Sequence, residues 1–236
     1  MSALDVVGEF TGFRPSGSDP SSPNKANQMF EFGLVVRIPP ARGMQLYGML
    51  TNEDKRDSIK RFFVDGSSYL AGVRLPALGA RGALGLCAEY TRTCALCFRH
   101  SLYRDGSTLN RKLIGTDLGP DAHGIHTEVT YDVSDELGFG LTLDWDYRGS
   151  DLKAAEVEPD GSQGDIITVQ SRPAEERYRA VLDTRIRLSK MTTLWGALGY
   201  ERVHNQHYVQ GDDVNNFKAA ISLSIDLDKH FKYLGN

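Results

Sequence analysis

The sequence predicts an all-β protein, an antiparallel transmembrane β-barrel of about ten to twelve strands. Three observations predict this fold. Apolar and polar side chains alternate along extended segments, most of these segments are long for strands, and the connections between them are alternately short and long. We therefore expect residues 1–236 to form a single outer-membrane domain, either closing by itself or contributing to a larger barrel.

The alternation is clearest near the C-terminus. From Phe217 to Leu227 every odd position is apolar, whereas the even positions are small, polar or charged. Residues 137–147 and 178–188 follow the same pattern. Successive side chains of a strand point to opposite faces, so each segment has one apolar and one polar face. A helical period fits none of the three segments.

Ten strands are predicted in this way. They cover residues 4–13, 28–38, 43–51, 68–76, 82–93, 123–133, 137–148, 177–188, 192–203 and 216–228. Most are longer than the roughly 5–6 residues common in soluble sheets. A tilted strand that crosses a membrane needs about 9–11 residues, which matches most of these segments.

The connections supply a second, independent signal. The short ones are residues 39–42, 77–81, 134–136 and 189–191. The long ones are residues 14–27, 52–67, 94–122, 149–176 and 204–215. Bacterial outer-membrane barrels have short periplasmic turns and longer extracellular loops, so we expect the long loops outside and both termini in the periplasm. Two of the long loops have room for a further short strand, at residues 96–103 and 166–171.

Charged residues fall on the face that would line the barrel. The predicted lumen charges are Glu128, Asp132, Asp144, Asp146, Arg179, Asp183, Arg185 and Arg187. Because they are of mixed sign, we expect most to pair with one another across the lumen, and the alternative is a selective channel lining. Aromatic residues near the strand ends are expected to form girdles at the membrane interfaces. They are Tyr47, Tyr90, Tyr131, Trp145, Tyr147, Trp195 and Tyr200.

Composition and charge exclude several classes of protein. The net charge is −4, which argues against nucleic-acid binding through a broad basic field. No apolar run is long enough for a membrane-spanning helix. The N-terminus has no basic stretch followed by an apolar one, so we expect a mature or N-terminally truncated form of an exported protein.

Nothing in the sequence predicts an enzyme, a cofactor or a metal site. Cys94 and Cys97 have C-x-x-C spacing without a second pair, which favours a loop-end disulfide or two unreactive thiols over a functional pair. The His123/His126 and His204/His207 pairs would point to opposite faces of a strand, a poor geometry for chelation. An outer-membrane protease is a weak alternative. It would use Asp144 and Asp146, which share a face, with His204 or His207 at the next rim region.

Several short motifs, which follow one another along the chain, indicate a relationship to a known family. They are Leu46-Tyr47-Gly48, Asn52-Glu53-Asp54, residues 88–93, 103–106 and 114–121, and Trp145-Asp146-Tyr147-Arg148. The segment that contains most of them, residues 52–151, resembles the capsule assembly protein family called Wzi. The resemblance implies an outer-membrane barrel that binds exported capsular polysaccharide and performs no catalysis. The candidate polysaccharide-binding residues lie in or beside the 94–122 loop. They are Tyr103, Asp105, Asn110, Asp117 and Asp121.

Two departures from the family pattern leave alternatives open. Family members have a longer N-terminal region, so this chain is either the C-terminal portion of a larger barrel or a barrel of ten strands that closes alone. The Thr116-Asp117 pair also differs from the family pattern. In the motif Leu118-Gly119-Pro120-Asp121, Gly permits unusual backbone angles and Pro fixes φ, which predicts a rigid turn. This turn either presents polar atoms to sugar hydroxyls or only locks the loop over the barrel mouth.

The function expected from the sequence is therefore binding or anchoring of a capsular or other surface polysaccharide. A porin-like diffusion channel for small solutes is the alternative, and a soluble ligand-binding barrel is a third. The expected partners are outer-membrane lipid and surface polysaccharide, with no nucleic acid. The sequence does not indicate an oligomeric state.

Overall fold

The structure is a computed structural model in which a single large sheet dominates. It describes residues 29–53, 63, 66–79, 81–95, 97, 108–109, 112–113, 118–149, 152–157 and 163–226. Apart from two short 3-10 turns, Pro39–Ala41 and Gln206–Tyr208, the regular structure in these residues consists of strands. A search of the same residues finds no helix with the length and apolar character needed to cross a membrane.

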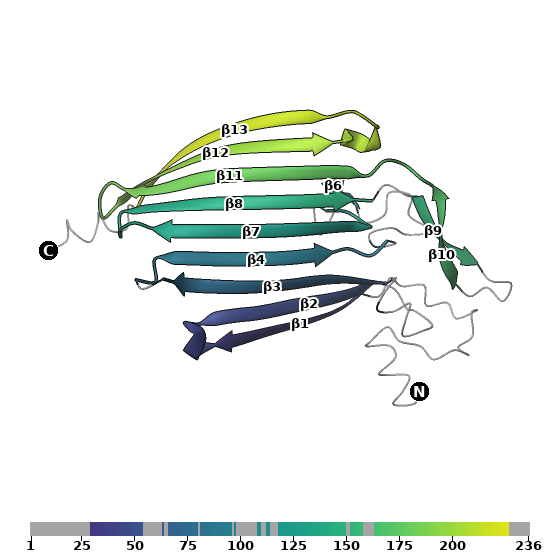
Figure 1. Ribbon diagram of the computed structural model, residues 1–236, viewed down its shortest axis with the longest axis horizontal. Coiled ribbons are helices and arrows are strands. Elements are labelled where there is room, and N and C mark those ends of the chain that lie inside the picture. The colour runs from purple at the N-terminus through teal and green to yellow at the C-terminus, as the bar shows by residue number, and fades with distance from the viewer. Residues whose placement is uncertain are drawn as a thin grey trace.

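Nine strands form the main sheet, and each is antiparallel to its neighbours. They are β1 (Met29–Ile38), β2 (Met44–Glu53), β3 (Ser67–Leu78), β4 (Leu84–Arg92), β7 (Ala122–Asp132), β8 (Leu137–Arg148), β11 (Glu175–Arg187), β12 (Thr192–His204) and β13 (Val214–Ile225). The spatial order follows the chain, from β1 at one edge to β13 at the other (Figure 1). Within the described strands these two edges do not pair, so the sheet is open there.

The strand prediction is confirmed for nearly every segment that the structure describes. Each of the nine sheet strands coincides with a predicted strand to within a few residues. The predicted strand at 4–13 lies outside the described residues, as does nearly all of 96–103, of which Cys97 alone is described, in a turn. The predicted strand at 166–171 is present as β10 (Gln163–Gln170), which pairs with β9 (Leu152–Val157). The small hairpin β5–β6 (Thr108–Leu109 and Lys112–Leu113) and β9 were not predicted.

The alternation of connection lengths is also confirmed. The short turns join β1 to β2, β3 to β4, β7 to β8 and β11 to β12, and they gather at one end of the sheet, on the left of Figure 1. The strand ends that the long connections join lie at the opposite end, on the right. We call these the short-turn end and the long-loop end.

Strand register divides the side chains into two faces. Directly opposed residues in an antiparallel pair share a face, and Asp144 lies opposite both His126 and Arg179. We call the face that carries these residues the polar face, and the other the apolar face. The apolar face is unusually open to its surroundings, with Phe217 81% and Ile221 84% exposed. Large apolar side chains exposed side by side mark a surface that contacts something other than water.

The predicted aromatic girdle needs one correction. Tyr90, Tyr131, Trp145, Tyr147 and Tyr200 are in register with other apolar-face residues, but Tyr47 and Trp195 lie on the polar face. Tyr47 lies opposite Gly72, whose missing Cβ leaves room for the phenol ring. Trp195 lies opposite Arg185. Neither of these two residues can therefore belong to a girdle on the apolar face.

Candidate functional site on the polar face and its long-loop rim

A charged cluster occupies the middle of the polar face. The Asp144 carboxylate on β8 contacts Nδ1 of His126 on β7 at 2.6 Å and accepts a hydrogen bond from Nε of Arg179 on β11 at 2.9 Å. Both partners lie directly opposite Asp144 in the neighbouring strands. The aspartate is nearly buried beneath them, with 11% of its side chain exposed. Strand register alone therefore assembles a charge-assisted cluster.

A second cluster lies at the long-loop end and is centred on Glu175. This carboxylate is nearly buried and lies 3.5 Å from the guanidinium groups of both Arg148 and Arg177. It also accepts the backbone amide of His207 at 3.0 Å, which connects the 205–213 loop to the sheet. Arg148 lies 4.0 Å from Asp146, and Arg177 lies 3.7 Å from Glu201 of β12. The cluster crosses β8, β11 and β12.

Most of the predicted lumen charges form ion pairs, but these pairs lie within the sheet, and pairing across a lumen stays a prediction. Asp132 pairs with Arg185 at 2.8 Å near the short-turn end, and Asp144, Asp146 and Arg179 belong to the clusters above. These contacts run within the sheet and not across a lumen. Most join the same or neighbouring strands, and the contact between Asp132 of β7 and Arg185 of β11 reaches over Gly138 of β8, which lies opposite both. Asp183 lies against Gly140. The structure records no pairing for Glu128, Asp183 or Arg187 within the residues that it describes.

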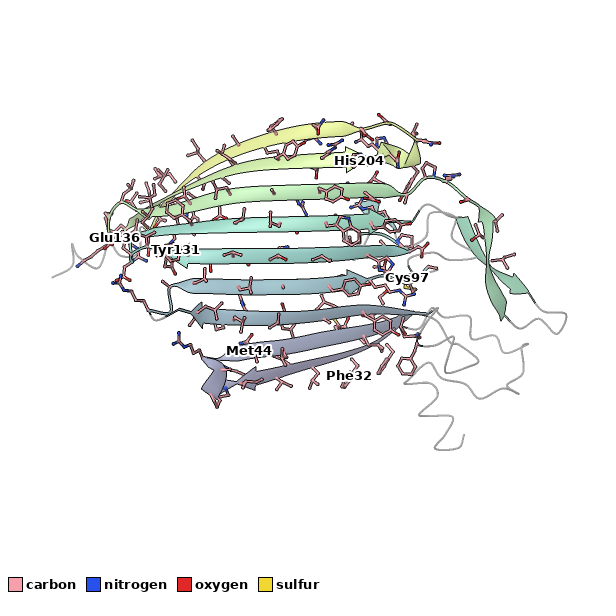
Figure 2. The ribbon with its side chains drawn as sticks, viewed as in Figure 1. Phe32, Met44, Cys97, Tyr131, Glu136 and His204 are labelled. Atoms are coloured by element: carbon pink, nitrogen blue, oxygen red, sulfur yellow. A yellow bond between two sulfur atoms is a disulfide. The ribbon has the colours of Figure 1, made fainter. Side chains whose placement is uncertain are left out.

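The rim at the long-loop end is held by a disulfide and a hydrogen-bonded turn. Cys94 and Cys97 are joined, which confirms one of the two favoured interpretations of their spacing (Figure 2). Ser68 at the start of β3 contacts both of them, accepting the amide of Cys94 at 3.1 Å and lying 3.3 Å from Sγ of Cys97. Both sulfurs belong to buried residues. The chain leaving β4 is thereby attached to β3.

The Leu118–Asp121 motif folds onto this rim. Thr93 donates its hydroxyl to the Gly119 carbonyl at 2.6 Å, and the same oxygen accepts the Ala122 amide at 2.9 Å. Gly119 and Asp121 both have positive φ, +78° and +54°, as the rigid-turn prediction requires. The buried Leu118 side chain lies over Gly124 on the polar face. The motif therefore covers the end of the polar face.

The 205–213 loop is fixed by two polar side chains. Asn205 donates its amide group to the Ala174 carbonyl at 2.9 Å and accepts the Gly211 amide at 2.9 Å. Asp213 accepts the Asn205 amide at 3.2 Å and contacts Nδ1 of His204 at 2.8 Å, at the long-loop end in Figure 2. The hydrogen bond from the Asn205 backbone, followed by that from His204, lowers the pKa of the Asp213 carboxyl below its usual value.

The structure describes only one of the five candidate polysaccharide-binding residues. Tyr103, Asp105, Asn110 and Asp117 lie outside the described residues. Asp121 is described, and its backbone donates to the Cys94 carbonyl at 3.0 Å and accepts the Gly149 amide at 2.9 Å. These bonds support the loop-locking role for the motif, and the contact of Asp121 with sugar stays a prediction.

Sequence reasoning missed the residues that organise the rim. Glu175, Glu201 and Asn205 were not singled out, although each lies within a few residues of a predicted strand end. Arg148 was named only as part of a family motif, without a role. A signal was available in the strand pattern. Arg148 and Glu175 continue the polar-face positions of β8 and β11 and lie directly opposite one another.

The histidines of the two pairs lie on different faces of the sheet, and His204 does not lie beside Asp144. His123 is on the apolar face, where its Nδ1 lies 2.7 Å from the Tyr90 hydroxyl, whereas His126 is on the polar face. His204 is on the apolar face with Asp213, so it lies on the opposite side of the sheet from Asp144. Among the described residues there is no group of three or more potential metal ligands.

The comparison with known families gives one match, and it covers most of the chain. The family described as capsule assembly protein Wzi matches residues 1–217. The chain belongs to the Wzi family. The match confirms the resemblance seen in the motifs and extends it beyond residues 52–151, through β12 and into β13. No curated protein and no solved structure matches the chain.

Membership of this family also indicates the fold class of the sheet and the membrane in which it lies. Wzi proteins are outer-membrane β-barrels of capsule assembly. The nine antiparallel strands of this Wzi protein, with one face apolar and exposed, are of that class. In such a barrel the apolar face contacts lipid and the polar face lines the interior.

Proposed function

We propose that this Wzi protein binds exported capsular polysaccharide at the cell surface and holds it there without catalysing a reaction. Its long connections would face the outside of the cell and its short turns the periplasm. Three features support this proposal. They are the family match, the separation of an apolar from a charged face, and the alternation of short and long connections.

The observation that carries the proposal is the packing of the long-loop end. Almost all the side chains of the sheet are at least partly exposed, and the buried non-glycine residues of the described part lie at this end. They are Asn52, Ser67, Thr93, Cys94, Cys97, Leu118, Ala122, Asp146, Glu175 and Val203. A rim fixed in this way presents its polar groups in one geometry, so a ligand loses less of its binding energy to ordering the protein.

The chemistry of the rim suits a carbohydrate. Sugar hydroxyls both donate and accept hydrogen bonds, so carboxylates and guanidinium groups can bind them. Both kinds of group come together around Glu175, Arg148 and Arg177, and Glu201 extends the cluster onto β12. Asp121, one of the predicted polysaccharide-binding residues, lies in the same rim.

The test is capsule retention on living cells. The gene is deleted in the encapsulated bacterium that carries it, and the fractions of polysaccharide bound to cells and released into the medium are measured. We expect polysaccharide to be made in equal amount but released, and expression of the wild-type chain should restore retention. An unrelated outer-membrane barrel expressed to the same level serves as the control.

Unchanged retention in the deletion strain would contradict the proposal. Single-channel conductance of the purified chain in a planar bilayer then decides whether the alternative, a porin-like diffusion channel, applies. A steady open conductance together with unchanged retention would replace polysaccharide binding by solute diffusion.

A further inference from the structure

The two ends of the apolar face differ in their acidic and basic residues. Within the nine described strands of the main sheet, such residues occur on this face only in the last two rows of opposed residues at the long-loop end. They are Arg92, His123, Glu176, Arg202 and His204. The rows in the middle of the sheet and at the short-turn end contain none. Lipid-facing charge is therefore confined to the level of one leaflet.

The residues of this set on β11 and β12 neutralise one another. Arg202 and His204 lie 3.9 Å and 2.8 Å from a carboxylate oxygen of Asp213. The Glu176 carboxylate accepts a hydrogen bond from the Tyr178 hydroxyl at 2.7 Å. Two carboxylates at this part of the rim would repel an anion.

The residues of this set on β4 and β7 are both basic. Arg92 lies directly opposite His123, and we call them the Arg92–His123 pair. Nδ1 of His123 is 2.7 Å from the Tyr90 hydroxyl, and the His123 ring centroid is 6.1 Å from those of Tyr90 and Tyr147. In the same two rows, the described residues of β3, β4, β7 and β8 on the apolar face include no carboxylate. This part of the lipid-facing rim is therefore basic and aromatic.

An apolar groove of about 360 Å³ begins beside this pair and extends toward the middle of the sheet. Ile125, at one end of the groove, is two residues from His123 on the same face of β7, or about 7 Å along the strand. The small side chains of Thr127 and Ala180 lie on either side of Leu143 and leave space between larger neighbours. The apolar-face residues that line the groove are Ile125, Thr127, Leu143, Trp145, Tyr178, Ala180 and Tyr200. A groove of this kind accepts a hydrocarbon chain.

We propose that the groove and the Arg92–His123 pair bind one phosphorylated lipid, with an acyl chain in the groove and the headgroup phosphate at the two basic side chains. A lipid reaches both parts without leaving the membrane, because the apolar face contacts lipid. Arginine binds phosphate by charge-assisted, often bidentate hydrogen bonds, and basic residues at a membrane surface attract anionic headgroups. Tyr90, Trp145 and Tyr147 lie at this level, as aromatic residues of a membrane interface do.

The charges around the groove decide where the phosphate lies. Its β7 side leads to the Arg92–His123 pair, whereas its β11 side leads to Glu176. The headgroup is therefore held on the β4–β7 side. With the long connections outside the cell, as proposed above, the lipid belongs to the outer leaflet. Binding of this lipid does not depend on binding of polysaccharide.

The inference is tested by the fluorescence of Trp145, with the full chain in phosphatidylcholine vesicles. The chain has two tryptophans, and W195F removes the one on the polar face. A small mole fraction of a lipid with bromine atoms on its acyl chains, close to the ester group, quenches a tryptophan that the lipid contacts. Brominated phosphatidic acid, which has an anionic phosphate, is compared with brominated phosphatidylcholine, which has no net charge. We expect Trp145 to prefer phosphatidic acid about fivefold, the factor for one basic residue near an anionic headgroup.

Two pairs of variants in the W195F chain make the test specific. R92Q/H123Q should lower the preference to about one, whereas R202Q, whose charge Asp213 already opposes, should change it less than about twofold. A180F fills the groove and should lower the preference below about twofold, whereas A219F places the same ring on the apolar face outside the groove and should not. Quenching by brominated phosphatidylcholine checks in every variant that Trp145 still faces lipid.

Equal quenching of the W195F chain by the two lipids would overturn the inference. So would an equal loss of preference in R92Q/H123Q and R202Q. A preference unchanged in A180F would overturn the groove as part of the site. Inorganic phosphate, added at constant ionic strength, should leave the preference intact, and its loss would overturn a lipid as the source of the phosphate. Each of these failures would leave the proposed function standing, because none involves polysaccharide.

Discussion

The two faces of the main sheet are formed by the same strands but are stabilised in different ways. On β12, Leu198 is 64% exposed on the apolar face, whereas its neighbour Ala197 lies opposite Asp183 on the polar face. Large apolar side chains on the apolar face are exposed, whereas polar-face residues form charge clusters centred on Asp144 and Glu175. A sheet that leaves its apolar side chains uncovered and buries its carboxylates is suited to lipid on one face and water on the other.

A second contrast runs along the strands. The short-turn end has tight turns and an exposed ion pair, Arg185 with Asp132. The long-loop end contains the disulfide, the covering motif and the buried carboxylates. Packing is therefore concentrated where the proposed polysaccharide site lies. The predictions below test these two contrasts, beginning with the largest expected effect.

Placing a charged side chain on the apolar face should have the largest effect on stability. Leu198→Arg places a charge at the centre of β12 on the lipid side, which costs about 2–4 kcal/mol at the middle of a bilayer. Ala197→Arg, the matched control, puts the same side chain opposite Asp183 and should be tolerated. Urea unfolding of the chain in lipid vesicles measures both. Equal destabilisation by the two variants would contradict the assignment of the faces.

Removing the Glu175 carboxylate, at the centre of the cluster at the long-loop end, should have the second-largest effect on stability. Glu175→Gln leaves Arg148 and Arg177 without their shared carboxylate in a nearly buried site, at a cost of about 2–3 kcal/mol. Glu176→Gln, one residue along on the apolar face, loses only an exposed hydrogen bond from Tyr178 and should cost less than about 1 kcal/mol. Amide hydrogen exchange of the 205–213 loop should increase for the first variant alone. An increase for both would show that the cluster does not fix this loop.

Removing the Cys94–Cys97 disulfide should have a smaller effect on stability, confined to the rim at the long-loop end. It closes a loop of only a few residues, so Cys94→Ser together with Cys97→Ser should cost about 2 kcal/mol at most. Limited proteolysis should cut the chain near residues 94–97 in this variant, whereas Cys87→Ser, on the polar face of β4, should resemble the wild type. Unchanged protection of the rim would show that the hydrogen bonds of Ser68 and Thr93 hold it without the disulfide.

The smallest effect is the response of the 205–213 loop to acid. The pKa of Asp213 is lowered in the folded protein, so its contribution to stability is present above the unfolded value of about 3.9 and is lost as the pH falls through the lower folded value. Amide exchange at Asn205 is therefore compared as a protection factor, the intrinsic exchange rate at each pH divided by the measured rate. The protection factor should be equal at pH 7 and pH 5 and fall below about pH 4. Asp213→Asn should show the low protection of the acid state at every pH, and a loss of protection above pH 5 in the wild type would assign the change to another group.

The sequence was sufficient to predict what depends on period and spacing. The nine described sheet strands, their antiparallel order and the polar face that carries Asp144 and Arg179 follow from alternation and connection length. The facing of Tyr47 and Trp195 was wrong because aromatic type and a strand-end position say nothing about which side of the strand a residue occupies. The sequence also could not show that Glu175 lies between Arg148 and Arg177, because that depends on which strands are neighbours and in which register.

The central claim is that this Wzi protein binds exported polysaccharide directly, and the most direct test uses the two purified components. The chain in detergent is immobilised, and the capsular polysaccharide of the bacterium that encodes it is passed over at increasing concentration. Saturable binding by the wild-type chain, abolished when the protein is unfolded by boiling and absent for an unrelated outer-membrane barrel, is the predicted result. If the folded chain retains no more polysaccharide than the unrelated barrel, the account is contradicted.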